Sequence, residues 1–354
     1  MSEFEADNSH YSIISTLGQC YNGVGVVYLA KHLPSGQMVA IKKFNMDMVK
    51  DEVNLIQHEI VLTKQLQHVN ILNNLVSYVN DSEVCVVSPL MGFSSCRDLL
   101  NVHFSEGLPE NAICLILRDV LEALEYIHRR GIIHRSVRAN HVLLSENGRA
   151  CLTGFRYSCP IIENGKWQKH IHSFPSKLVR PNLNWLSPEV LAQNLRGYNE
   201  KSDIYSFGIL ICELANGSEP YSEMTTTLML TEKMKGTTPH LLDCTTIFPD
   251  DHDGHGDSAL KSLLHNQAKR KFSESLHEIA ALCLQQEPSE RPTACQLLTH
   301  PYFRFNRKHM HLSEYLLPAL PLSDKVAYNR EDMESLENIR RMSDIDINSY
   351  EWDF

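Results

Sequence analysis

The stretch His134-Arg135-Ser136-Val137-Arg138-Ala139-Asn140-His141 decides how the rest of this 354-residue chain is interpreted. It follows a segment, residues 110–130, whose apolar side chains recur at the spacing of a core-facing helix. It precedes two short apolar runs, Val142–Leu144 and Ala150–Leu152, which flank Asn147-Gly148, a strong signal for a β-hairpin. The sequence therefore predicts a polar loop held between a buried helix and a hairpin.

Composition and charge are those of an ordinary globular protein. Hydrophobic residues make up 43% of the chain and charged residues 21%. The formal charge of −10 argues against general nucleic-acid binding, because such binding needs a basic surface that displaces the counterions of phosphate. The ten cysteines are scattered without CxxC pairs, as expected of reduced thiols. This usage predicts a cytoplasmic protein and leaves the nucleus open.

The sequence predicts no targeting segment and no membrane partner. The N-terminus, Met1-Ser2-Glu3-Phe4-Glu5, is acidic and lacks an apolar signal core. The longest apolar run, about residues 204–215, is interrupted by Ser206, Gly208 and Glu213. That run is too short to span a bilayer.

The first ~90 residues are rich in predicted strands, and the remainder is mostly helical. Segments with β-branched and aromatic residues predict strands at 12–16, 24–31, 38–44 and 84–87. The turn Pro34-Ser35-Gly36 joins two of them as a hairpin. Residues 51–67 predict one helix in this part, and Ser202 is the predicted N-cap of a buried helix that runs through Leu214.

Residues 250–271 form a polar segment that contains Asp251-His252-Asp253-Gly254-His255-Gly256-Asp257. Its side chains are of the types that bind metals. We interpret it instead as a solvated insertion loop, because the flexible glycines would not preorganise ligands.

Four motifs that protein kinases carry occur here in their usual order. Val39-Ala40-Ile41-Lys42 is followed seventeen residues after the lysine by Glu59, and Ser187-Pro188-Glu189 precedes Glu290-Arg291-Pro292. The chain therefore resembles a protein kinase over about residues 11–303. The resemblance implies a Lys42–Glu59 ion pair next to the nucleotide cleft.

This resemblance implies an α+β, bilobal, protein-kinase-like fold. A small strand-rich N-lobe would cover about residues 11–91, and a larger helical C-lobe about residues 92–303. Residues 1–10 would be an N-terminal extension and residues 304–354 a C-terminal tail. Two architectural contacts are also implied: Glu189 would pair with Arg291, and Asp203 would brace residues 134–141 from below.

Residues 134–141 resemble the kinase catalytic loop, H-R-D-L-x-x-x-N, but the Asp and the Asn that carry its chemistry are both replaced. Ser136 stands where an Asp accepts the substrate proton, and His141 stands where an Asn holds magnesium. Gly154-Phe155-Arg156 falls at the D-F-G position, so Gly154 replaces a second magnesium ligand. A serine cannot accept a proton usefully near neutral pH, and a neutral imidazole is poorly matched to magnesium. We therefore predict no catalytic residue, no metal site and no enzyme activity.

Nucleotide binding is predicted through the hinge and one lysine. The loop over residues 17–28 is longer by two residues than the usual G-x-G-x-x-G pattern, so a phosphate-covering loop and a simple strand-turn-strand have equal weight. Ser88-Pro89-Leu90-Met91 would form the hinge that faces adenine. ATP is the expected ligand, without efficient use of magnesium or turnover. The predicted nucleotide-binding residues are Gly18, Gly25, Lys42, Glu59, Pro89 and Met91.

A narrower resemblance rests on unusual details that extend over nearly the whole chain. The replaced catalytic loop, the G-F-R string and the longer glycine loop are similar to those of the STRAD adaptors, pseudokinases related to the sterile-twenty kinases. Further strings with this similarity are His172-Ser173-Phe174-Pro175, Trp185-Leu186-Ser187-Pro188-Glu189 and Tyr198-Asn199-Glu200-Lys201-Ser202-Asp203-Ile204-Tyr205-Ser206. Two details differ: Lys42 is retained here, and Asp353 replaces a Glu.

The resemblance implies two protein partners. One is a serine/threonine kinase of the liver kinase B type, a tumour suppressor, which the adaptor would bind and activate allosterically. Residues 156–185 would present the surface for it, with Trp167 and Phe174 as partner-binding side chains. The other partner is a helical-repeat scaffold, Mo-twenty-five or calcium-binding protein thirty-nine. The final residues Trp352 and Phe354 resemble the W-E-F terminus that docks into it.

Two other functions remain open at this point. An atypical, weakly active serine/threonine kinase would use Lys42 together with a displaced acid. A plain nucleotide sensor would bind ATP without any protein partner.

Overall fold

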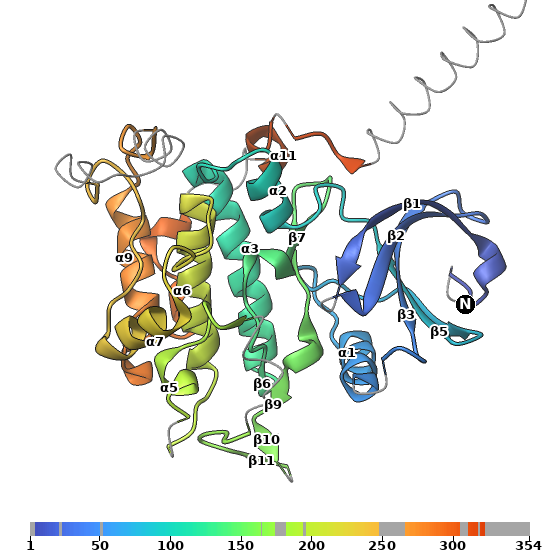
Figure 1. Ribbon diagram of the computed structural model, residues 1–354, viewed down its shortest axis with the longest axis horizontal. Helices are drawn as coiled ribbons and strands as arrows, with labels where there is room; N and C mark the ends of the chain where they lie inside the picture. The colour runs from blue at the N-terminus through green and yellow to red at the C-terminus, as the bar shows by residue number, and fades with distance from the viewer. Residues whose placement is uncertain are drawn as a thin grey trace, which may run out of the picture.

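The computed structural model describes residues 4–20, 23–49, 52–163, 165–173, 182–193, 196–247, 266–304, 311–317 and 319–322. A twisted sheet with one helix forms the smaller lobe, and a stack of helices forms the larger lobe (Figure 1). The predicted α+β, bilobal, kinase-like fold is confirmed. Among the described helices, none is long and apolar enough to cross a membrane.

The N-lobe sheet has five antiparallel strands in the order β1-β2-β3-β5-β4. Its strands are β1 (Tyr11–Cys20), β2 (Gly25–His32), β3 (Met38–Asn45), β4 (Val76–Asn80) and β5 (Glu83–Pro89). The predicted strands correspond to β1, β2, β3 and β5. Strand β4 was not predicted, because this edge strand has only one buried position, Tyr78, and so lacks an apolar alternation.

Residues 4–10 pack onto the N-lobe sheet. Phe4 is buried with its ring 4.7 Å from the ring of His32, and the Tyr11 hydroxyl donates to the Glu5 carbonyl over 3.0 Å. A short 3₁₀ turn, η1 (Asn8–His10), leads into β1. Phe4 of the predicted N-terminal extension therefore joins the same apolar cluster as the sheet.

Helix α1 (Val53–Gln65) confirms the helix expected over residues 51–67 and lies between the sheet and the C-lobe (Figure 1). After the hinge, α2 (Cys96–Val102) begins at a capping box in which Ser95 and Asp98 satisfy each other's backbone N–H groups. This helix was not predicted, because two turns are too short for a clear apolar period.

The C-lobe is built on α3 (Glu110–His128) and α6 (Lys201–Asn216). Its other helices are α5 (Pro188–Leu191), α7 (Thr226–Lys235), α9 (Glu274–Cys283), α10 (Ala294–Leu298) and α11 (Leu312–Tyr315). Short strands pair as β7 (Val142–Leu144) with β8 (Ala150–Leu152), β6 (Ile132–Ile133) with β9 (Cys159–Pro160), and β10 (Ile162–Glu163) with β11 (Lys166–Trp167). The hairpin predicted around Asn147-Gly148 is the β7–β8 pair. Its 3₁₀ turns are η3 (Ala139–His141), η4 (Phe155–Tyr157), η6 (Pro288–Glu290) and η7 (Pro301–Arg304).

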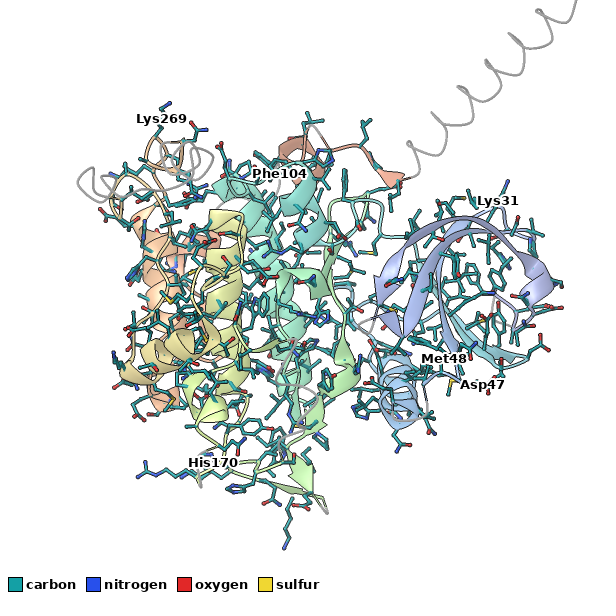
Figure 2. All side chains as sticks on the ribbon, in the orientation of Figure 1. Lys31, Asp47, Met48, Phe104, His170 and Lys269 are labelled. Carbon is teal, nitrogen blue, oxygen red and sulfur yellow. The ribbon has the colours of Figure 1, made fainter. Side chains whose placement is uncertain are left out.

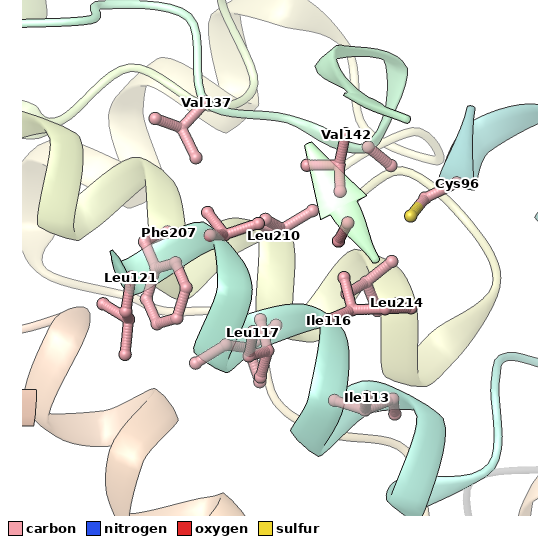
Figure 3. Packing of buried hydrophobic residues seen from close by; sticks show 14 of the residues in the cluster. Cys96, Ile113, Ile116, Leu117, Leu121, Val137, Val142, Phe207, Leu210 and Leu214 are labelled. Carbon is pink, nitrogen blue, oxygen red and sulfur yellow. The ribbon is translucent and has the colours of Figure 1, made fainter. Parts of the chain in front are cut away.

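Buried side chains of α3 and α6 meet in the centre of the C-lobe. Ile116 and Leu117 face Leu210 and Leu214 there (Figure 3). Each such side chain contributes about 1.5–3 kcal/mol through its removal from water. The N-terminus of α6 differs from the expectation: the helix begins at Lys201, and the Ser202 hydroxyl donates to the Asn199 carbonyl instead of capping the helix.

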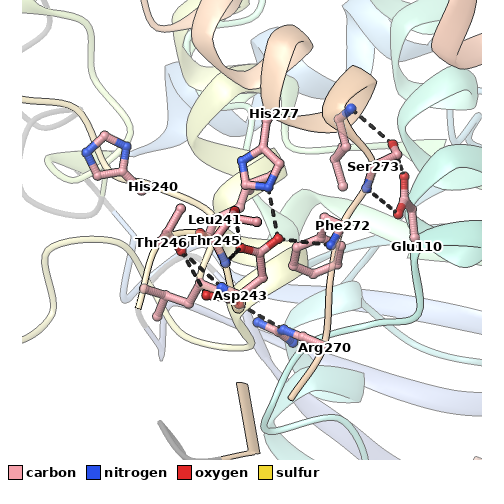
Figure 4. Close-up of polar contacts among 12 residues, drawn as sticks. Glu110, His240, Leu241, Asp243, Thr245, Thr246, Arg270, Phe272, Ser273 and His277 are labelled. Carbon is pink, nitrogen blue, oxygen red and sulfur yellow. Dashed lines mark hydrogen bonds and ion pairs between the residues drawn. The ribbon is translucent and has the colours of Figure 1, made fainter. Parts of the chain in front are cut away.

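Asp243 joins the two chain segments that flank residues 248–265 (Figure 4). Its carboxylate accepts from the backbone N–H of Phe272 and from the His277 ring, each over 2.9 Å, and from Thr245. Burial alone would raise the pKa of Asp243, but these hydrogen bonds outweigh it and hold the pKa below its usual range. Most of the predicted polar loop at 250–271 lies outside the described residues.

The C-lobe continues past residue 304 into the predicted tail. Leu312 and Leu316 are fully buried against the core around α3, and Ala319 is buried beside them. The Leu322 backbone N–H then donates to the Gly92 carbonyl over 2.8 Å, which brings residue 322 to the hinge. The described part of the predicted tail therefore connects the C-lobe core with the hinge at the interlobe cleft.

Candidate nucleotide cleft and degenerate catalytic loop

The degenerate catalytic loop, residues 134–141, is braced from below by Asp203, as predicted. The buried carboxylate of Asp203 accepts from the backbone N–H groups of His134 over 2.7 Å and of Arg135 over 2.8 Å. A third bond comes from the His128 ring over 2.9 Å. Arg135 has φ +66°, so these bonds hold a backbone conformation that non-glycine residues rarely adopt.

The second predicted architectural contact is also present. The Arg291 guanidinium donates to both oxygens of Glu189 over 2.7 and 2.8 Å, and Arg291 is buried. A bidentate pair of this kind is geometrically specific. It fixes the start of α5 against the base of the C-lobe.

A cavity of about 650 Å³ lies between the two lobes. That volume suits a small-molecule ligand. The predicted site residues that line it are Gly18, Lys42, Glu59, Pro89, Met91, Ser136, His141 and Gly154.

Gly25 is not among the residues that line the cavity. A Cβ at this position would lie 2.6 Å from the Phe44 ring and 2.7 Å from Cys20 Sγ. Gly25 therefore allows close packing inside the sheet, where we had expected it to approach phosphates. Gly23, with φ +90°, lines the cavity in its place.

The His141 imidazole fills the space beside Gly154. A Cβ at residue 154 would lie only 2.6 Å from His141 Cγ, and Gly154 has φ +84°. His141 Nδ1 lies 2.7 Å from the Ser136 carbonyl, and because a carbonyl only accepts, Nδ1 carries the proton. Burial, reinforced by the nearby Arg138 cation, lowers the pKa of His141 well below its usual value, so the ring is neutral.

Ser136 is occupied by a structural hydrogen bond. Its buried hydroxyl donates to Asn182 Oδ1 over 2.7 Å. The side chain at the general-base position therefore links the loop to residue 182.

The charged side chains that line the cavity are mostly cationic. Lys42, Arg138 and Arg156 face two carboxylates, Glu59 and Asp98. Asp98 caps α2 by accepting from the Ser95 backbone and hydroxyl. Among the described residues, no group of three or more His, Cys, Asp or Glu side chains is arranged to hold a metal ion. This set of charges suits an anionic ligand.

The predicted Lys42–Glu59 ion pair is wrong for this structure: among the ion pairs of the described residues, none joins these two side chains. Glu59 is instead buried beside the backbone N–H groups of Phe155 and Gly154, which favour its charged form but do not offset its burial. Burial raises the pKa of Glu59 to about 7 and lowers the pKa of Lys42. Both changes weaken the attraction between the two groups, because each favours the neutral form.

Three residues at this site were not predicted. Glu52, at the N-cap of α1, forms an ion pair with Arg156, and His58 Nε2 lies 3.0 Å from the Ser158 carbonyl. Leu322 lines the cavity from the C-terminal side. No local sequence pattern predicts these contacts, because the contacting residues are about 100 or more positions apart along the chain.

Of the predicted partner-binding residues, the structure describes one. Trp167 is 59% exposed on the β10–β11 hairpin. His170 lies just beyond this hairpin, at the lower edge of the molecule in Figure 2. Phe174, Trp352 and Phe354 lie outside the described residues.

The fold and the cleft together define a member of the protein kinase fold family, and the protein kinase domain family matches residues 11–303. STE20-related kinase adapter protein alpha from Gallus gallus is 40% identical over 346 residues, which cover 92% of this chain and 88% of that protein. The alpha protein from Mus musculus is 35% identical over 99% of this chain and 86% of its own length. The beta protein from Homo sapiens is 35% identical, with 91% and 80% covered. The chain belongs to the STE20-related kinase adapter family, which confirms the STRAD resemblance.

Gly154→Asp is expected to lower the melting temperature by several degrees, because the new side chain meets His141 and strains the backbone, at a cost of about 1–3 kcal/mol. Gly165→Asp is the matched control, since Gly165 has φ +74° and no atom within 4 Å of its Cβ position. The double variant Gly154→Asp with His141→Asn should recover much of the loss. Equal melting temperatures for the two single Asp variants would contradict the proposed steric role of His141.

The unfolding free energy is expected to depend on pH through Glu59. Because the pKa is raised to about 7 in the folded state, the folded protein binds more protons than the unfolded chain between pH 4.5 and 7. The stabilising contribution of Glu59 to the unfolding free energy is therefore fully present below pH 4.5. It is lost as the pH rises from there through 7, by up to ~1.4 kcal/mol per pH unit.

Denaturant unfolding of wild type and Glu59→Gln from pH 5 to 8 measures this effect. The difference in unfolding free energy between wild type and Glu59→Gln should decrease as the pH rises. The exposed Glu163→Gln control should have the same unfolding free energy as wild type at every pH. Parallel curves for wild type and Glu59→Gln would contradict the effect.

Proposed function

We propose that this chain is a catalytically deficient pseudokinase adaptor. It binds and allosterically activates a serine/threonine kinase of the liver kinase B type, in a complex with a Mo-twenty-five-type scaffold. The observation that carries the proposal is a fully braced catalytic loop whose chemical positions hold Ser136, His141 and Gly154. The names of the curated relatives, which are adapter proteins, agree with it.

Phosphoryl transfer depends on positioning and on metal ions that neutralise the charge developing on the phosphate. The Ser136 hydroxyl donates a hydrogen bond to Asn182 Oδ1, so it is not positioned to act as a base. The neutral His141 ring occupies the volume that a carboxylate at residue 154 would need. Ordinary kinase chemistry would therefore require changes at three coupled positions.

The cleft binds ATP in this proposal without turning it over efficiently. The hinge residues Pro89 and Met91 border the cavity, as Lys42 does. Lys42 and Arg138 would offset part of the triphosphate charge that magnesium neutralises in an active kinase. ATP would act as a ligand that stabilises the closed lobes.

The partner kinase is proposed to bind residues 156–185, which correspond to the activation segment of a kinase. Trp167, next to Lys166, is a large exposed aromatic side chain on strand β11, and Trp is enriched at interaction hot spots. Activation requires that the adaptor bind the active state of its partner more tightly. A preference of about 3 kcal/mol shifts that equilibrium roughly a hundredfold.

A phosphotransfer experiment separates this function from its rival, a weakly active kinase, which the retained Lys42 favours. Purified protein with radiolabelled ATP, magnesium or manganese and generic substrates should incorporate no phosphate above background. Mixed with the partner kinase and the scaffold, it should raise the partner's activity at least tenfold. Incorporation that disappears in Lys42→Met would instead establish the protein as an enzyme and overturn the adaptor assignment.

The scaffold contact is tested by deletion of residues 352–354. The loss of Trp352 and Phe354 should abolish capture by the scaffold, because large aromatic anchors dominate the energy of such docking. The melting temperature should stay within about a degree, since the deletion removes no residue of the described core. Unchanged capture by immobilised scaffold would refute this docking mode.

A further inference from the structure

We propose that Arg156 is a positioning residue. Its ion pair with Glu52 joins α1 to residues 154–158, where the activation segment begins, and holds the helix in place when the cleft is empty. This inference deepens the proposed function, because it explains how the adaptor would keep its shape, and its structural half can be tested without the partner. Arg156 stands at the third position of the G-F-R string, where D-F-G has glycine.

The Arg156–Glu52 pair is largely shielded from water. Its side chains are 9% and 19% exposed, and the pair joins residues 104 positions apart. Glu52 occupies the N-cap position of α1, but its side chain makes no capping bond and reaches Arg156 instead. A shielded pair is costly to break from one side, because the remaining charge stays buried without its partner.

Two further polar contacts join the same helix to the same segment. His58 Nε2 lies 3.0 Å from the carbonyl and 3.1 Å from the hydroxyl of Ser158. The buried Glu59 carboxyl lies beside the backbone N–H groups of Phe155 and Gly154, which favour its charged form. Between these contacts, Leu55 packs against the apolar cluster that contains Tyr157 and Ile161.

Three of the residues that make these contacts share one face of α1. Positions 52, 55 and 59 are separated by three and four residues, the spacing that brings side chains onto one side of a helix. Figure 1 shows this helix directly beside the turn η4. Helix α1 is therefore attached along two turns to residues 154–158, and Lys42 contributes no ion pair to this attachment.

The attachment continues toward the proposed partner surface. The Ile161 backbone N–H donates to the Gly131 carbonyl over 2.6 Å, and Gln168 N–H donates to the Ile161 carbonyl over 2.8 Å. Ile161 immediately precedes the β10–β11 hairpin that carries Trp167. The helix and the hairpin are thus connected through residues 154–161, the segment that contains Arg156.

Hydrogen exchange on the full-length, nucleotide-free protein tests the proposal. Arg156→Glu should raise the exchange rate of amides in residues 53–65 and 159–167 at least tenfold. The charge-swapped double variant Glu52→Arg with Arg156→Glu should return both segments toward wild-type rates. Lys42→Met should leave the rates in residues 53–65 unchanged.

Two controls separate a local effect from general unfolding. Amides of α3 should keep their protection in every variant, and Arg129→Glu, which disrupts the exposed Arg129–Glu125 pair, should change none of the rates in these segments. The proposal is overturned if Arg156→Glu leaves residues 53–65 protected, if the charge swap fails to restore them, or if Lys42→Met exposes them equally.

The same variants, mixed with the partner kinase, read out the functional half. Activation should fall at least fivefold with Arg156→Glu and return with the charge swap. If the wild-type protein does not activate the partner while the exchange pattern holds, the adaptor function fails and the positioning role of Arg156 stands.

Discussion

The buried carboxylate of Asp203 on α6 determines where the catalytic loop lies. By accepting two consecutive backbone N–H groups, it keeps Arg135 in a left-handed conformation that the chain would otherwise avoid. Because α6 is buried nearly all round in the C-lobe core, the carboxylate cannot move independently of that core. The loop therefore keeps the shape of a kinase catalytic loop whether or not its side chains perform chemistry.

The cleft shows how a fold persists after its chemical residues have changed. His141 and Gly154 complement each other sterically, and the imidazole is oriented by the Ser136 carbonyl. The hydroxyl of Ser136 in turn satisfies Asn182. Each replaced position thus makes a structural contact with its neighbours, so the three act as a unit, and restoring one of them alone would disturb the others.

Helix α1 is held by electrostatic contacts that differ from those expected of a kinase. Glu59 is buried beside peptide N–H groups, and the ion pair is formed by Glu52 and Arg156 instead. Because that pair lies at the start of the helix, it connects the N-lobe to the activation segment without the lysine of the nucleotide cleft. A protein whose output is its shape benefits from such a connection, since the shape then depends less on what occupies the cleft.

The sequence by itself determined the replaced chemical positions, and the resemblance of its ordered motifs to those of protein kinases implied the bilobal fold, the brace by Asp203 and the Glu189–Arg291 pair. Only the tertiary structure decided that Lys42 and Glu59 do not pair, that Gly25 serves packing, and that Arg156 and Leu322 reach the cleft. These outcomes depend on burial and on tertiary contacts, some of them between residues far apart in the chain, such as Glu52 and Arg156. Local patterns carry no information about such distances, so the partner of a charged side chain appears only when the lobes are packed together.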